Sequence, residues 1–159
     1  MKTLIFAFFL IPFGNSIAQM PSNRTYLELN VGVADLPEYG DALFPGVSFL
    51  VGYQYYISEH AFLDIQGGLA FPSIITAKTG VGVKANGIGC SVGVRIFPTM
   101  GYAQIHFPTQ NGQLNISAEA SPFANYSNYR STLSIEAKSI FTIGYQWNLG
   151  KGKIKQKEE

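Results

Sequence analysis

Residues 141–149 read FTIGYQWNL, and apolar and small or polar side chains alternate along this stretch. Phe141, Ile143, Tyr145, Trp147 and Leu149 fall on one side, whereas the residues between them are Thr, Gly, Gln and Asn. A period of two is the signature of a β-strand, because successive side chains point to opposite faces of a sheet. The stretch therefore predicts a strand with one apolar face and one small or polar face.

The same alternation recurs along the chain and predicts an all-β protein of eight antiparallel strands in up-and-down order. Asn86-Gly87 and Asn111-Gly112 are hairpin turn signals between such runs. No run shows the 3.6-residue spacing of an amphipathic helix. The predicted strands span 26–34, 47–56, 62–71, 75–85, 88–97, 102–107, 114–121 and 132–149.

The first residues predict export. Lys2 precedes an apolar run, TLIFAFFLIPF, and small residues at Ser16 and Ala18 suit cleavage before Gln19. These are the parts of a secretory signal peptide. We therefore expect a signal peptide at 1–18, a β-barrel at 19–149 and a short charged tail at 150–159.

Composition favours a membrane barrel. Charged residues make up 13% of the chain, against about 25% in ordinary soluble domains, and aromatic residues reach 14%. The net charge of +1 gives no support for nucleic-acid binding. The small polar face suits a narrow lumen, and the apolar face suits lipid.

We expect interfacial aromatic residues at Tyr53, Tyr55, Tyr102, Tyr145 and Trp147, with Cys90 pointing outward. A soluble exported barrel or sandwich is the alternative.

The last strand also matches the closing-strand signal of bacterial outer-membrane barrels through Thr142, Gly144, Trp147 and Leu149. On this motif and the strand pattern, the chain resembles small outer-membrane barrels of the OmpA-transmembrane-domain and OmpX type, in the style of Bacteroidota. The resemblance implies a monomeric eight-stranded transmembrane β-barrel in the outer membrane, with both termini periplasmic. It also implies contact with membrane lipid and lipopolysaccharide, and with the barrel-assembly machinery and periplasmic chaperones during biogenesis. Those proteins end at the motif, whereas this chain continues for ten residues.

Eight charged residues are predicted on the inward face, four acids and four bases. Because an unpaired charge in a narrow lumen is costly, we expect a network of salt bridges that closes the barrel. A small gated pore or a ligand-binding barrel is the alternative, and His106 is able to join either arrangement. The predicted lumen residues are Glu28, Asp64, Lys78, Lys84, Arg95, His106, Glu119, Glu136 and Lys138.

The sequence carries no catalytic signature that we can identify. Neither His60 nor His106 is followed by the Ser of a His-x-Ser pair, and no Gly-x-Ser-x-Gly elbow is present. No phosphate-binding or dinucleotide motif occurs, and two histidines without partners make a poor metal site. We expect no enzyme, metal or cofactor, and a lipid-modifying enzyme is the outsider.

Two longer connections, 35–46 and 122–131, are candidate outer loops. Tyr with small polar neighbours is adaptable binding chemistry. Tyr39, Phe44, Tyr126 and Tyr129 are the candidate contacts for an extracellular ligand of unknown identity.

Overall fold

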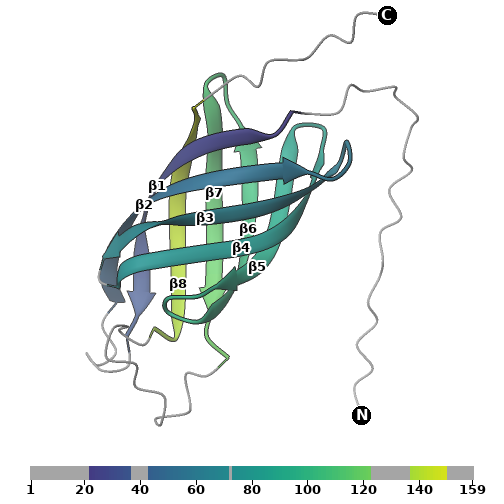
Figure 1. Ribbon diagram of the computed structural model, residues 1–159. Helices are drawn as coiled ribbons and strands as arrows, with labels where there is room; N and C mark the ends of the chain where they lie inside the picture. Colours follow the sequence, from purple (N-terminus) through teal and green to yellow (C-terminus); the bar gives the residue numbers. More distant parts are fainter. Residues whose placement is uncertain (1–21, 37–42, 72, 123–136, 150–159) are drawn as a thin grey trace, which may run out of the picture.

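The chain forms a closed eight-stranded barrel in the computed structural model, which describes residues 22–36, 43–71, 73–122 and 137–149 (Figure 1). Each strand pairs antiparallel with the next, and β1 pairs with β8 to close the sheet. None of the described residues forms a helix long and apolar enough to cross a membrane. The strands are β1 (Arg24–Asp35), β2 (Leu43–Tyr56), β3 (Ala61–Phe71), β4 (Ile74–Ala85), β5 (Ile88–Arg95), β6 (Met100–Pro108), β7 (Gly112–Ala120) and β8 (Ser139–Asn148).

The predicted all-β, up-and-down barrel is therefore confirmed, with changes at strand ends. β2 begins at Leu43 rather than Val47, because β1 continues to Asp35 and pairs with Leu43 there. β8 begins at Ser139, so Ala137 and Lys138, which were predicted within the strand, precede it, and residues 132–136 of that prediction lie outside the described part. The proposed signal peptide (1–18) and tail (150–159) also lie outside it.

The two faces of the wall differ sharply in polarity. Outward positions are aliphatic or aromatic along most strands, as at Val31, Val51, Ile65 and Val81. Among the outward positions of the described strands, Asp35 at the end of β1 is the only charged residue. Inward positions are mainly polar or Gly, and most of the inward polar side chains are buried. This is the reverse of a water-soluble barrel, whose outer face is charged.

The connections divide the barrel into two ends. The short turns at 57–60, 86–87 and 109–111 share one end with Arg24 and Asn148, so both ends of the barrel wall meet there. In the turn at 86–87, Asn86 has φ 51° and Gly87 has φ 86°. These left-handed values are what the predicted two-residue hairpin turn requires. We call this the turn end, and the opposite end the loop end.

An apolar cluster lies in the lumen at the loop end. Ala34, Leu36, Met100 and Ala137 are buried together, and Phe44 and Ile140 pack against them. Phe44 was expected in an outer loop, and that prediction is wrong because Phe44 belongs to β2. Its ring lies 5.8 Å from that of Phe71.

Tyr102 is a second correction. It was expected at the membrane interface, but it lies inside the barrel, 4% exposed, on the same face of β6 as Gln104 and His106. Its ring and hydroxyl occupy space left by Gly80 and Gly93, where an added Cβ would lie within 3 Å of them. The pair of glycines thus makes room for an inward tyrosine.

Candidate functional site

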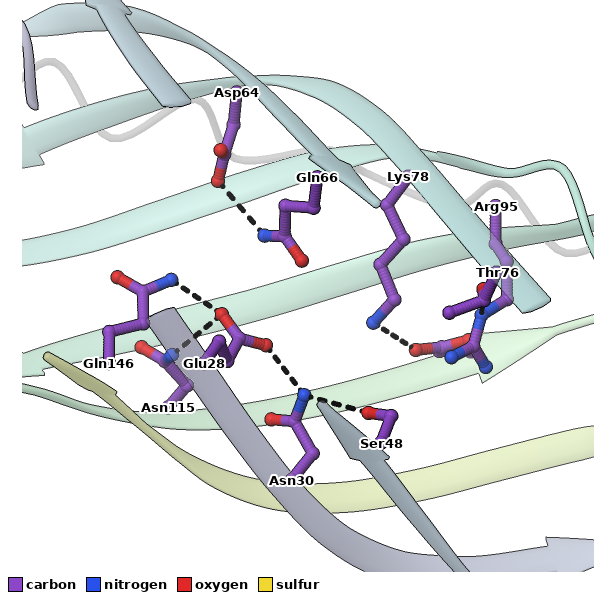
Figure 2. A network of polar contacts seen from close by, with 11 residues as sticks. Glu28, Asn30, Ser48, Asp64, Gln66, Thr76, Lys78, Arg95, Asn115 and Gln146 are labelled. Atoms are coloured by element: carbon purple, nitrogen blue, oxygen red, sulfur yellow. Dashed lines mark hydrogen bonds and ion pairs between the residues drawn. The ribbon is translucent and has the colours of Figure 1, made fainter. Parts of the chain in front are cut away.

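The lumen is the candidate site, because it gathers nearly all the buried polar side chains of the described residues. Figure 2 shows part of this network, including Glu28, Lys78 and Arg95. Eight strands enclose little more than the volume of their own inward side chains. Here these side chains form hydrogen bonds across the lumen with side chains from other strands. The fully buried large side chains are Tyr26, Lys78, Leu36, Leu50, Met100, His106, Gln54, Gln104, Gln146, Glu28, Asn115 and Thr76.

Glu119 on β7 joins two cations from the facing strands. Its Oε1 lies 2.6 Å from Nζ of Lys78, and its Oε2 lies 2.8 Å from Nη1 of Arg95. Nε of Arg95 also donates to Oγ1 of Thr76 at 2.8 Å. We call Lys78, Arg95 and Glu119 the ion triad. It ties β4 and β5 to β7 and carries one positive charge in excess.

Glu28 on β1 is fully buried and is held by amides instead of cations. Its Oε1 accepts from Nδ2 of Asn30 at 2.7 Å. Its Oε2 accepts from Nε2 of Gln146 at 2.6 Å and from Nδ2 of Asn115 at 3.2 Å. Three donors to one carboxylate replace much of the water lost on burial.

Asp64 on β3 follows the same pattern. Its Oδ1 accepts from the Tyr26 hydroxyl at 2.5 Å, and its Oδ2 lies 3.2 Å from Nε2 of Gln66 and 3.4 Å from that of Gln54. Among the described residues, neither Asp64 nor Glu28 forms an ion pair. The expectation that each lumen carboxylate pairs with a cation therefore fails for these two, because the strand register places amides beside them.

Arg24 closes the turn end and was missed at the sequence level. Its guanidinium donates to Gln54 at 2.7 Å, to Gln113 at 2.6 Å, to Gln146 at 3.0 Å and to Asn148 at 3.0 Å. One side chain thus joins β1, β2, β7 and β8. A signal was present, since Arg24 has the same parity as Glu28 and extends the alternation of β1 upstream.

The remaining predicted lumen charges lie at the periphery or outside the described residues. Lys84 is half-buried on the inward face of β4. Lys138 is exposed and precedes β8, so its predicted place in the lumen is wrong; the barrel wall begins one residue later. Glu136 lies outside the described residues.

His106 belongs to a chain of polar contacts that resembles a nucleophile, base and orienting group. Nε2 lies 2.9 Å from Oγ of Ser91, and Nδ1 lies 2.9 Å from Oδ1 of Asn115. Because Nδ2 of Asn115 donates to Glu28, its Oδ1 accepts from Nδ1–H, and Nε2 is left to accept from the Ser91 hydroxyl. Ser91 is only 1% exposed, so its hydroxyl is not open to a substrate. The arrangement instead joins β5, β6, β7 and β1 inside the barrel.

The closing-strand residues occupy both faces of β8. Thr142 and Gly144 point inward, whereas Trp147 is outward, with its ring 4.9 Å from that of Tyr145; Leu149 is exposed just after β8. Gly144 also has a packing role, since a Cβ there would lie 1.8 Å from Oδ1 of Asn30.

The candidate loop contacts Tyr39, Tyr126 and Tyr129 lie outside the described residues. Cys90 is exposed on the outer face. Within the described ranges, no group of three or more His, Cys, Asp or Glu side chains is placed to hold a metal ion.

Comparisons with known proteins leave the family open. No model of a known protein family matches the chain, and no curated protein matches it. One solved structure is similar, a chain described as "De novo design of transmembrane beta-barrels". It shares 17% sequence identity over 82% of this chain and 98% of that chain, with a TM-score of 0.48. A likeness at this level supports no conclusion about function.

Proposed function

We propose that the protein is a monomeric, integral β-barrel of the bacterial outer membrane, with a closed lumen and a structural or surface-interaction role. The observation that carries the proposal is the polarity of the wall. Large apolar side chains are exposed all round it, whereas Glu28, Asp64, Lys78 and Arg95 are buried inside. Water would leave this apolar surface unfavourably hydrated, whereas lipid accepts it, and a closed sheet leaves no backbone group unpaired.

The dimensions of the wall support the same placement. Its strands are 8 to 14 residues long, and a tilted transmembrane strand needs about 9–11 residues. Tyr53, Tyr55, Tyr145 and Trp147 lie on the outer face toward the turn end, where an interfacial aromatic girdle belongs. In this orientation the turn end is periplasmic and the loop end faces outward.

The proposed partners follow from this placement. They are outer-membrane lipid and lipopolysaccharide around the wall, with the assembly machinery and chaperones during biogenesis. Tyr39, Tyr126 and Tyr129 are proposed contacts for an extracellular ligand. We propose no catalytic activity and no cofactor, because the Ser91 hydroxyl, the one nucleophile beside His106 among the described residues, is buried and held by that histidine.

A lysine placed on the wall tests the membrane placement. Ile65 is 60% exposed near the middle of β3, and Ile57 is 55% exposed in a turn. Ile65→Lys should destabilise the membrane-inserted barrel by about 2–4 kcal/mol, the cost of a lysine at the bilayer midplane. Ile57→Lys should have little effect. Carbonate-resistant membrane recovery and a heat-dependent gel shift, which reports a closed barrel, are the measurements.

A soluble barrel makes the opposite prediction for this pair. If the wall faces water, both lysines are tolerated equally and the wild-type protein is recovered in the soluble fraction. Either result would overturn the membrane placement, because the two isoleucines are similarly exposed and only Ile65 lies on the wall.

A second prediction concerns conduction. The side chains of Arg24, Glu28 and the ion triad, held by hydrogen bonds and ion pairs, block the lumen. The wild-type barrel should therefore give no stable conductance steps in planar bilayers. Arg24→Ala removes four hydrogen bonds at the turn end. The ion triad stays in place, so this variant should also show no conductance steps. Steps in the wild type that change with Arg24→Ala would favour the alternative of a small gated pore.

A further inference from the structure

At the loop end of the lumen, a partly open cavity of about 40 Å³ is lined by Arg95 of the ion triad and by Ala34, Leu36 and Ala137 of the apolar cluster. Its polar lining includes Arg95, Ser48 and Thr142, and its walls include Gly32, Gly46 and Ala70. The small wall residues leave the space open. A buried water needs roughly 10–15 Å³ of such space, so the cavity has room for a few water molecules or one small ion.

The charge beside the cavity is positive. Arg95 is 4% exposed, and it shares the single carboxylate of Glu119 with Lys78. A buried charge without compensation is costly. The carboxylates of Glu28 and Asp64 also lie in the lumen, but neither borders the cavity, and their oxygens are already engaged by amides and by the Tyr26 hydroxyl.

The hydroxyl groups beside the cavity have hydrogens to donate. Oγ1 of Thr142 is buried and has no hydrogen-bond partner among the described residues. Oγ of Ser48 accepts from Nδ2 of Asn30 at 3.1 Å, which leaves its own hydrogen available. Buried polar groups are normally paired, so a hydroxyl left over beside a cavity indicates a missing partner, and a partner that also contacts the Arg95 guanidinium must accept.

We propose that this cavity binds a small inorganic monoanion of halide size. Arg95 supplies the charge, and the hydroxyls of Ser48 and Thr142 donate hydrogen bonds to the ion. A water molecule would satisfy the hydroxyls, but it would not offset the positive charge that Arg95 places beside the cavity.

Chloride titration of the full-length barrel in detergent tests the proposal, with gluconate replacing chloride at constant ionic strength. The thermal midpoint should rise with chloride and saturate, because a ligand that binds only the folded state stabilises it. Thr142→Val, which keeps the shape but removes the hydroxyl, should raise the apparent Kd about tenfold, corresponding to one hydrogen bond. Thr142→Ser, which keeps the hydroxyl, should retain chloride binding. If Thr142→Val folds poorly, Ser48→Ala takes its place in the test and should raise the apparent Kd in the same way.

Ser117→Ala is the matched control. Oγ of Ser117 is also buried without a partner, but Ser117 does not border the cavity. Its loss should leave the chloride dependence unchanged. Crystals grown with bromide should show an anomalous peak beside Arg95, Ser48 and Thr142. Equal midpoints in chloride and gluconate, a cavity holding water alone, or equal losses in Ser117→Ala and Thr142→Val would overturn the proposal.

Discussion

Glu119→Gln should lower the free energy of unfolding by about 3–5 kcal/mol, the cost of removing one partner from a buried ion pair. The carboxylate contacts Lys78 and Arg95 at 2.6 and 2.8 Å, and both cations are almost fully buried. An amide cannot neutralise either of them. Urea unfolding in detergent, followed by tryptophan fluorescence of Trp147 and by gel mobility, measures the change.

Two further variants separate the lost charge from lost packing. Adding Lys78→Met and Arg95→Met to Glu119→Met should restore stability, because well-packed apolar residues often replace a buried ion network at no cost. Glu59→Gln, in the turn at 57–60, should stay within about 0.5 kcal/mol of wild type, as surface changes usually do. If Glu119→Gln is as mild as Glu59→Gln, the lumen is wet, and water screens the stranded cations.

Gly144→Val should abolish most of the folded barrel, with a cost at or above the upper end of the roughly 1–3 kcal/mol typical of overpacking. A Cβ at this position would lie 1.8 Å from Oδ1 of Asn30 and 2.8 Å from the carbonyl oxygen of Leu29. Asn30 holds Glu28 and Ser48, so it has little freedom to move. The clash falls on the β1–β8 pairing that closes the barrel. The yield of heat-modifiable protein measures the loss.

The matched control is Gly67→Val, since the nearest atom to a Cβ there is 4.0 Å away, and this variant should fold. Asn30→Ala in a Gly144→Ala background distinguishes two roles of Gly144. If packing against Asn30 limits folding, the double variant should recover part of the yield lost by Gly144→Ala alone. Recognition by the assembly machinery predicts no recovery.

The alternation of side chains was enough to predict the strands and most of their inward faces. Glu28, Asp64, Lys78, Arg95, His106 and Glu119 all lie inside, as their parity indicates. The same alternation also places Tyr102 inside the barrel, because Tyr102 is two residues from Gln104 and therefore on the same face of β6. Lys138 was misplaced because the strand was extended past its start at Ser139.

The contacts within the lumen were beyond the reach of the same reasoning. Parity places Asn30 beside Glu28 on β1, but nothing local indicates that Glu28 also meets Gln146 and Asn115 rather than a lysine, or that Ser91, His106 and Asn115 form one chain of contacts. These partners come from different strands, and Glu28 and Gln146 are 118 residues apart in the sequence. They meet only through the stagger of the closed sheet.

The sequence by itself determined the fold class, most of the strands and the polarity of the two faces of the sheet. The physical basis is that a period of two is a property of the extended backbone, whichever strands it pairs with. The tertiary structure alone decided which inward groups touch, which carboxylates pair with cations and which accept hydrogen bonds from amides, and where a cavity lies beside Arg95. The physical reason is that register and stagger are fixed by closing all eight strands at once, and they set the rows of side chains across the lumen.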